Sequence, residues 1–247
     1  MNEPVLEAVG AGFAGANGRV LLRDVNLRVG PGEIVAVAAP AGEGKSLLLR
    51  VLCGLDQATE GSVRVLGRET VGMTHGAFVD LWREMGFVYQ EGGLISNLTL
   101  AENVALPLGW RARRDQPGAR ARAEELCAEL ELGEHAHDRP GGMGLGVKKR
   151  AAVARALAPR PRLIFVDDPF IGSDPQGEHA IREKLRREAS VRDMSVVAAL
   201  SDLDPLRHPW VRLVLLLDGT VWADGPYDEV AARARQSDPR VQRFFAA

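Results

Sequence analysis

Eight consecutive residues, Ala39-Pro40-Ala41-Gly42-Glu43-Gly44-Lys45-Ser46, have the types and spacing of a phosphate-binding loop. The expected pattern is Gly, four variable residues, Gly-Lys and then Ser or Thr, and only Ala39 departs from it. Glycines let backbone N–H groups turn toward phosphate oxygens, the lysine reaches the β and γ phosphates, and the hydroxyl binds Mg²⁺. The alternative is a chance glycine-rich turn. The predicted nucleotide-binding residues here are Pro40, Ala41, Gly42, Glu43, Gly44, Lys45 and Ser46.

A carboxylate follows the apolar run Leu163–Val166, which reads as a buried strand. Asp167 would then lie at the carboxyl end of a strand, where open α/β sheets bind ligands. A buried carboxylate is costly unless a cation compensates its charge, so Mg²⁺ shared with Ser46 is the expected partner. The alternative is a helix N-cap. The chain has no Asn-Lys-x-Asp sequence of the kind that reads guanine, which favours ATP over GTP.

The elements that must position these residues alternate between strands and helices. Strands are expected at Val5–Phe13, Val20–Val29, Ile34–Ala38, Leu163–Val166 and Ser195–Leu200, with a strand pair around Val211–Trp222. Alternation of this kind predicts an α/β fold with a largely parallel core sheet. Residues 1–247 are predicted to form one domain. Its core comprises about 1–90 and 158–247, and about 91–157 form an inserted helical subdomain.

With these motifs in place, the chain resembles the ATP-binding subunits of ABC transporters over nearly its whole length. Gln90 matches the Q-loop glutamine, Asp174 matches the D-loop aspartate, and residues 150–157 match the helix after the family signature. The resemblance implies a P-loop NTPase with a RecA-like core and an N-terminal antiparallel β subdomain. It also implies that Gln90 helps hold Mg²⁺, and that the protein works as a dimer beneath a membrane permease.

Within that family, three stretches look most like the ATPase of Mla-type lipid transporters, which serve Mce proteins. These stretches are QEGGLISNLTLAENVALPL, DDPFIGSDP and SDPRVQRFF. The resemblance implies phospholipid trafficking as the task. The implied partners are integral-membrane permease subunits, an Mce-type lipid-binding protein, a small regulatory subunit, and either a second copy or a different ABC ATPase.

Several functional positions depart from the family pattern. Asp168 stands where the catalytic glutamate is expected, and it is one methylene shorter. Ser201 stands where the switch histidine is expected. Met143–Val147 replaces the signature Leu-Ser-Gly-Gly-Gln and lacks its serine, although the backbone N–H groups of Gly144 and Gly146 could still bind a partner's phosphate. A base must come within about 2.6–3.2 Å of its proton or act through water, so these departures weaken hydrolysis more than binding.

Two functions are therefore expected from the sequence. The first is an ATPase of ordinary or reduced rate that powers transport, with Asp168, Gln90 and Ser201 in the catalytic roles. The second is a subunit that binds ATP and regulates or scaffolds a transporter with little hydrolysis of its own. A purified chain that turns over at about 1–10 s⁻¹, the usual enzymatic range, would exclude the second function.

The remaining sequence patterns limit the expected partners and location of the protein. A net charge of −2 argues against nucleic acid as the main partner. Cys53 and Cys127 lack Cys-x-x-Cys spacing and read as structural thiols. No signal peptide and no bilayer-spanning run is visible, so the expected location is the cytoplasm, peripheral on the inner membrane face through the permease. The Arg111–Arg122 stretch reads as a solvated basic face, with lipid headgroups as the alternative.

Three further features were assigned less specific roles. Phe13 is the one candidate for an adenine-stacking aromatic, and a core side chain of the first strand is the alternative. His135 and His137 read as solvated loop residues. The apolar residues Leu94, Leu98, Leu100, Val104 and Leu106 are expected to include a permease contact, with subdomain core accounting for at least half of them.

Overall fold

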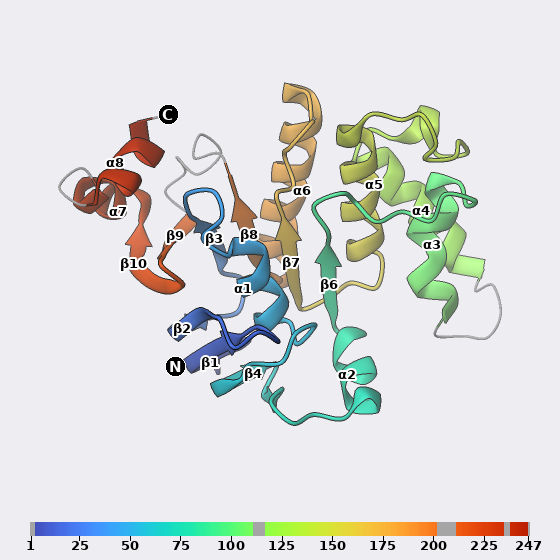
Figure 1. Cartoon of the computed structure of the whole chain (residues 1–247). Coiled ribbons are helices and arrows are strands. Elements are labelled where there is room, and N and C mark those ends of the chain that lie inside the picture. The colour runs from blue at the N-terminus through green and yellow to red at the C-terminus, as the bar shows by residue number, and fades with distance from the viewer. Residues whose placement is uncertain (1–2, 111–116, 202–210, 235–237, 247) are drawn as a thin grey trace. The chain divides into compact units, whose positions relative to one another are not determined.

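The computed structural model describes residues 3–110, 117–201, 211–234 and 238–246. The chain forms two compact units (Figure 1). The first comprises Met1–Leu81 and Ser195–Ala247, and the second comprises Trp82–Met194. Each unit has its own strands, helices and buried side chains, and each is described by itself below.

The first unit contains two sheets. The antiparallel sheet has the order β2-β1-β4-β5, from β1 (Leu6–Ala14), β2 (Val20–Val29), β4 (Glu60–Val65) and β5 (Arg68–Glu69). The other set has the order β10-β9-β3-β8, from β3 (Ile34–Ala38), β8 (Ser195–Leu200), β9 (Val211–Leu217) and β10 (Thr220–Pro226). The helices are α1 (Lys45–Leu52), α2 (His75–Trp82), which ends at the boundary, α7 (Tyr227–Ala234) and α8 (Pro239–Ala246).

Strand β3 is the central strand of this unit. Its side chains are apolar, and nearly all of them are buried. It runs parallel to β8 on one side and to β9 on the other. Short, fully apolar strands of this kind are typical of parallel sheets that are covered on both faces. Because β3 is held on both edges, the loop that leaves its carboxyl end has a fixed starting point.

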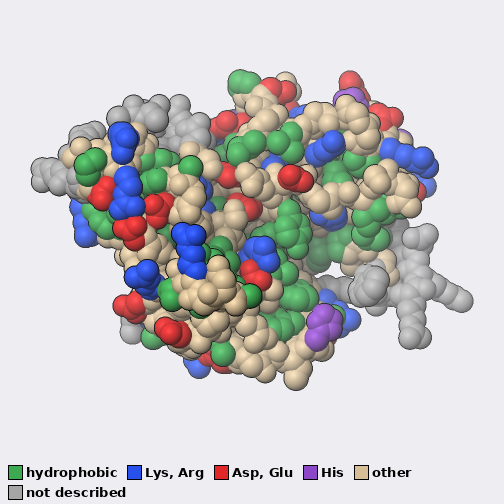
Figure 2. Space-filling view, in the orientation of Figure 1, with side chains coloured by type: hydrophobic (Ala, Val, Ile, Leu, Met, Phe, Trp, Pro, Cys, Tyr) green, Lys and Arg blue, Asp and Glu red, His purple; other side chains and the backbone are tan. Residues whose placement is uncertain are grey.

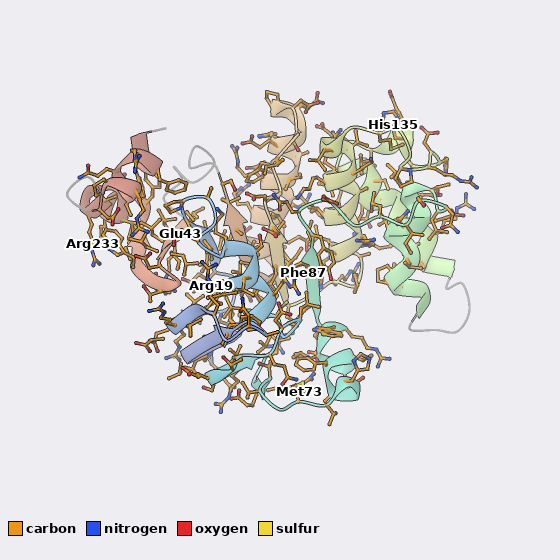
Figure 3. All side chains as sticks on the ribbon, viewed as in Figure 1. Arg19, Glu43, Met73, Phe87, His135 and Arg233 are labelled. Atoms are coloured by element: carbon orange, nitrogen blue, oxygen red, sulfur yellow. The ribbon has the colours of Figure 1, made fainter. Side chains whose placement is uncertain are left out.

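The second unit is built from two parallel strands and a set of helices. Strands β6 (Met85–Val88) and β7 (Leu163–Asp167) pair from Met85↔Leu163 to Val88↔Val166. The helices are α3 (Leu100–Trp110), α4 (Pro117–Glu129), the short η1 (Gly133–His135), α5 (Leu145–Leu157) and α6 (Pro175–Arg192). Every residue of β7 is buried. The ring of Phe87, which Figure 3 labels on β6, stacks on that of Phe165 on β7, with centroids 6.5 Å apart.

The α/β fold class is confirmed, and the predicted strands lie within one residue of their expected bounds, except that the last strand pair extends four residues beyond Trp222, to Pro226. Among the elements that were not predicted are α2 and β6. The α2 sequence, His75–Trp82, has only two fully buried side chains, Phe78 and Leu81, so its apolar periodicity is weak. Strand β6 is four residues long and contains Gly86, so it lacks the uninterrupted apolar run that marks Leu163–Val166. The domain boundaries proposed from sequence, with a helical insertion at about 91–157, stay a prediction.

Neither cysteine is in a disulfide, and both are buried. Burial raises the pKa of the Cys53 thiol to about 12 and that of Cys127 to about 11, because a thiolate would lose its hydration. Of the basic stretch, 111–116 lie outside the described residues. On α4, Arg120 pairs with Glu124 and is exposed, as a solvated face requires, whereas Arg122 pairs with Glu125 but has a largely buried side chain. Among the helices described, none is both long and apolar enough to cross a bilayer.

Candidate functional site

The loop between β3 and α1 has the backbone of an anion cradle. Gly42 and Gly44 adopt left-handed conformations with φ of 85° and 93°, which side-chain-bearing residues rarely adopt. Gly44 is the N-cap of α1 and provides no side-chain cap for its first N–H groups. Because the first four N–H groups of a helix lack intrahelical acceptors, this end of α1 can donate to an anion.

Lys45 begins α1, and its side chain folds back over the loop. Its Nζ donates to the carbonyl oxygen of Ala39 at 3.0 Å. Ala39 is the one departure from the loop pattern. It is not among the residues with positive φ, so its Cβ causes no backbone strain where a glycine is usual. The substitution therefore leaves the cradle intact, and the backbone carbonyl of this position, which a glycine would also have, accepts from the lysine.

In the second unit, the carboxylate that is predicted to bind Mg²⁺ lies at the strand end that the sequence pattern indicated. Asp167 is the last residue of β7 and is buried, as is Asp168. Asp168 has a φ of 46°, in the left-handed region, and precedes Pro169. Aspartate tolerates that region better than most residues because its short polar side chain can hydrogen-bond locally. The backbone here offers a physical reason for aspartate where the family has glutamate.

Lys149 is a buried residue of the second unit, and its role was not predicted from the sequence. Its Nζ donates to the carbonyl oxygen of Asp167 at 2.7 Å and to that of Tyr89 at 3.2 Å. Burial lowers the pKa of Lys149 to about 8, although the nearby charges of Asp167 and Asp168 act in the opposite direction. The lysine therefore ties α5 to the carboxyl ends of both β6 and β7.

The loop after β6, which carries Gln90, is held by the same helix. Gln90 itself is exposed in the turn that follows Val88. Arg155 on α5 donates to the carbonyl oxygens of Gly93 at 2.8 Å and Gly92 at 3.0 Å. Gly92 is left-handed, and a Cβ there would lie 3.2 Å from the Lys148 carbonyl oxygen. Close packing thus fixes the path of the Gln90 loop on α5.

The degenerate signature forms the start of α5. Gly144 is the N-cap, with no side-chain cap, at the position where the family has its serine. Gly146 is buried, and a Cβ on it would lie 2.6 Å from the carbonyl oxygen of Gly172. The turn around Gly172 therefore packs directly on the signature turn. The missing serine leaves the N–H groups of this helix end as the groups that can bind an anion.

The other predicted site residues have simpler surroundings. Asp174 caps α6, its Oδ1 accepting from the Gly177 N–H at 2.6 Å, so a structural role is already assigned to it. Ser201 is exposed directly after β8. Phe13 is half-buried on β1, opposite Leu22. His135 is exposed on η1 and contacts Asp138 at 3.2 Å (Figure 3).

The apolar segment after Gln90 divides as expected between core and surface. Leu100 and Val104 are fully buried in α3. Leu94 and Leu98 are half-buried. Leu106 is exposed, as are Ile95 and Tyr89 nearby in sequence. Within the described residues, no group of three or more His, Cys, Asp or Glu side chains is placed to hold a metal ion.

The fold and these motifs define a P-loop ATPase cassette, and comparison with known proteins identifies its family. The ABC transporter family model matches residues 22–171. The phosphonates import ATP-binding protein of Paraburkholderia xenovorans is 33% identical over 224 residues, which are 85% of this chain and 74% of that protein. The chain therefore belongs to the ABC transporter family, as its ATP-binding component.

Other relatives differ in cargo and in length. The methionine import ATP-binding protein of Corynebacterium glutamicum is 31% identical over 90% of this chain. The macrolide export ATP-binding/permease protein of Burkholderia cenocepacia is 35% identical over 92%. The chain spans 60% and 33% of their respective lengths. A solved dimeric cassette, MJ0796 bound to ADP and Pi, matches with a TM-score of 0.82 at 30% identity, over 90% of this chain and 98% of that one.

Proposed function

We propose that this protein binds ATP and Mg²⁺ as the nucleotide-binding subunit of a membrane transporter, and that it hydrolyses ATP to drive transport. The observation that carries the proposal is the loop between β3 and α1. Two left-handed glycines, an uncapped helix N-terminus and the Lys45 ammonium are gathered on eight residues. That set of donors suits a triphosphate, whose oxygens accept hydrogen bonds and carry the opposite charge.

Mg²⁺ fits the chemistry of the predicted ligands. Ser46, Asp167 and Gln90 offer hydroxyl, carboxylate and amide oxygens, the hard donors that Mg²⁺ prefers together with substrate phosphates. Ser46 belongs to the first unit, whereas Asp167 and Gln90 belong to the second, so their meeting at one nucleotide is part of the proposal. When bound, the metal would neutralise charge on the β and γ phosphates.

The remaining residues have proposed roles in turnover. Asp168 takes the proton of the attacking water, and Ser201 donates to the γ-phosphate. The α5 N-terminus, at Gly144 and Gly146, offers its N–H groups to the nucleotide of a second copy or of another ABC ATPase, and Asp174 lies at the same dimer contact. The dimeric state of the cassette MJ0796 supports this arrangement.

A contact with an integral-membrane permease is the proposed output. The exposed apolar side chains Tyr89, Ile95 and Leu106 support it, because they lie on and after the Gln90 loop of the second unit. Through that contact the protein would be peripheral on the cytoplasmic membrane face. Relatives named for methionine, phosphonate and macrolide transport share the cassette, so the cargo assignment depends on other residues.

We further propose that the cargo is phospholipid, with an Mce-type protein and a small regulatory subunit in the complex. The three Mla-like stretches support this, and two of them contain proposed functional residues, Gln90 and Asp168. The test is the ATPase rate of the chain reconstituted with its permease. Added phospholipid should raise that rate, and a rate that responds only to methionine or phosphonate would contradict the lipid assignment.

An ATP-binding regulatory subunit with little hydrolysis is the second candidate. It is favoured by Gly144 in the serine position, by the short Asp168 and by Ser201 in the histidine position. A lost transition-state hydrogen-bond donor alone costs on the order of 10²–10³ in rate. The two candidate functions predict different rates of ATP hydrolysis, and a single experiment can measure that rate.

We expect phosphate release by the purified chain to be slower than about 1 s⁻¹, and Asp168→Glu combined with Ser201→His to raise it at least about tenfold. The longer acid and the imidazole would restore reach toward water and phosphate. Asp168→Asn in the same assay is the control and should stay at background. A wild-type rate of about 1–10 s⁻¹ would exclude the regulatory candidate. No gain from the double change would contradict the roles given to Asp168 and Ser201.

A further inference from the structure

The phosphate loop of this chain contains an acidic residue, Glu43, directly before Gly44. A carboxylate in a loop that binds a triphosphate is unfavourable, because like charges repel strongly where water is partly excluded. Glu43 lies on the loop between β3 and α1 (Figure 3). Its side chain is largely buried, so solvent screens it less than a surface charge. The structure must therefore compensate this charge.

Two donors from the carboxyl-terminal part of the first unit contact the Glu43 carboxylate. The backbone N–H of Asp218, in the β9–β10 turn, donates to Oε2 at 2.6 Å. The Arg240 guanidinium, on α8, donates to Oε1 at 3.3 Å. Among the described side chains, Arg240 is the cation that forms an ion pair with Glu43.

Arg240 is itself held in place by two further carboxylates. It donates to both oxygens of Asp218, at 2.9 and 2.8 Å, and to both oxygens of Asp238, each at 3.1 Å. These bonds hold the pKa of Asp218 and that of Asp238 below their ordinary values. Acidic and basic side chains alternate on this part of the surface (Figure 2). The Arg240 side chain is 41% exposed, and its two bidentate pairs orient the planar guanidinium more firmly than a single ion pair would.

Helix α8 that carries Arg240 is anchored by apolar contacts. Val241 is fully buried. The Phe245 ring lies 6.2 Å from that of Tyr227, at the start of α7, and 5.9 Å from that of Phe244. The position of the Arg240 head group therefore depends on the docking of α8, which follows the phosphate loop by nearly 200 residues in sequence.

We propose that Arg240 is a positioning residue for the phosphate loop. From α8 it compensates and orients the Glu43 carboxylate, so that an acidic residue can lie beside a bound triphosphate. This inference rests on the proposed ATP site. It makes α8 an electrostatic component of nucleotide binding that acts through Glu43.

The test measures the affinity of the full chain for a fluorescent ATP analogue with Mg²⁺, at low and high salt. Arg240→Ala leaves three neighbouring carboxylates without the cation that they share. We therefore expect the affinity for the ATP analogue to fall about tenfold at about 0.05 M salt. The loss should shrink below about twofold near 1 M salt, where the Debye length is only about 3 Å. Arg243→Ala, on the same helix, should leave affinity unchanged.

The double variant Glu43→Gln with Arg240→Ala separates charge from helix docking. If charge is the cause, it should bind within about twofold of Glu43→Gln alone, because no loop carboxylate then needs compensation. A double variant as weak as Arg240→Ala would mean that α8 undocking is the cause and would overturn the proposal. So would an Arg240→Ala chain that binds like the wild type. A wild-type chain that binds no ATP would refute the proposed function instead, and this inference with it.

Discussion

Replacing Lys45 with alanine should weaken ATP binding about 100-fold. A hydrogen bond from a charged donor to a charged acceptor contributes about 1.5–3 kcal/mol, and each 1.4 kcal/mol is about a tenfold change in affinity. In the described structure the Lys45 ammonium is held over the loop by the Ala39 carbonyl, so it is already positioned for phosphate. Calorimetric titration of the variant with ATP and Mg²⁺ measures the loss.

The matched control for this prediction is Arg50→Ala. Arg50 is a cation on the same helix, but it lies in the last turn, where it is half exposed and pairs with Asp56. An exposed ion pair of this kind contributes little, so affinity should change less than about twofold. If Lys45→Ala binds ATP as tightly as the wild type, the loop is not the nucleotide site.

Replacing Gly61 with alanine should destabilise the fold by about 2–5 kcal/mol. Gly61 lies at the start of β4 with φ of 68°, a conformation that costs an L residue about 1–2 kcal/mol. Its Cβ would also lie 2.2 Å from the Gly10 carbonyl oxygen on β1, so the two paired strands must move apart. Overpacking of this kind adds about 1–3 kcal/mol.

The control for Gly61 is Gly72→Ala. Gly72 also has a positive φ, of 75°, but no atom lies within 4 Å of the position of its Cβ. It should therefore show the conformational cost alone, about 1–2 kcal/mol. Urea denaturation of the two variants compares them directly. Equal midpoints would show that the β1–β4 approach is not rigid.

The sequence identified the phosphate loop and the Asp167 strand because their chemistry is local. Runs of apolar residues place the phosphate loop directly after one strand and Asp167 at the end of another, without any knowledge of distant contacts. The other buried, fully apolar strands were predicted for the same reason. Strand β6 was missed because Gly86 interrupts its short apolar run.

Roles that depend on distant contacts were not predicted. Lys149 is on the buried face of α5, three residues after Gly146 and three before Ala152. That spacing was visible in the sequence. Lys149 lies between Lys148 and Arg150, however, and the three basic residues together are typical of a solvated surface. The Glu43–Arg240 contact joins residues 197 apart in sequence, which no local pattern reveals.

The departures from the family pattern acquire physical reasons in the structure. The left-handed φ at Asp168 suits an aspartate, and the glycine N-cap at Gly144 replaces a side-chain cap with open N–H groups. Neither change removes a residue of the phosphate loop. We therefore expect nucleotide binding to be better preserved than hydrolysis, which is the basis for expecting slow turnover.

The most direct test of the account is the thermodynamic linkage between Mg²⁺ and ATP. If Lys45 and Asp167 serve one metal-bound triphosphate, Mg²⁺ should tighten ATP binding by the wild-type chain at least about tenfold in calorimetry, because coupling between ligands is reciprocal. Asp167→Asn should abolish most of that gain while ATP still binds through the loop. An Asp167→Asn chain that keeps the full Mg²⁺ effect, or a wild-type chain that gives no heat with ATP and Mg²⁺, would contradict the account.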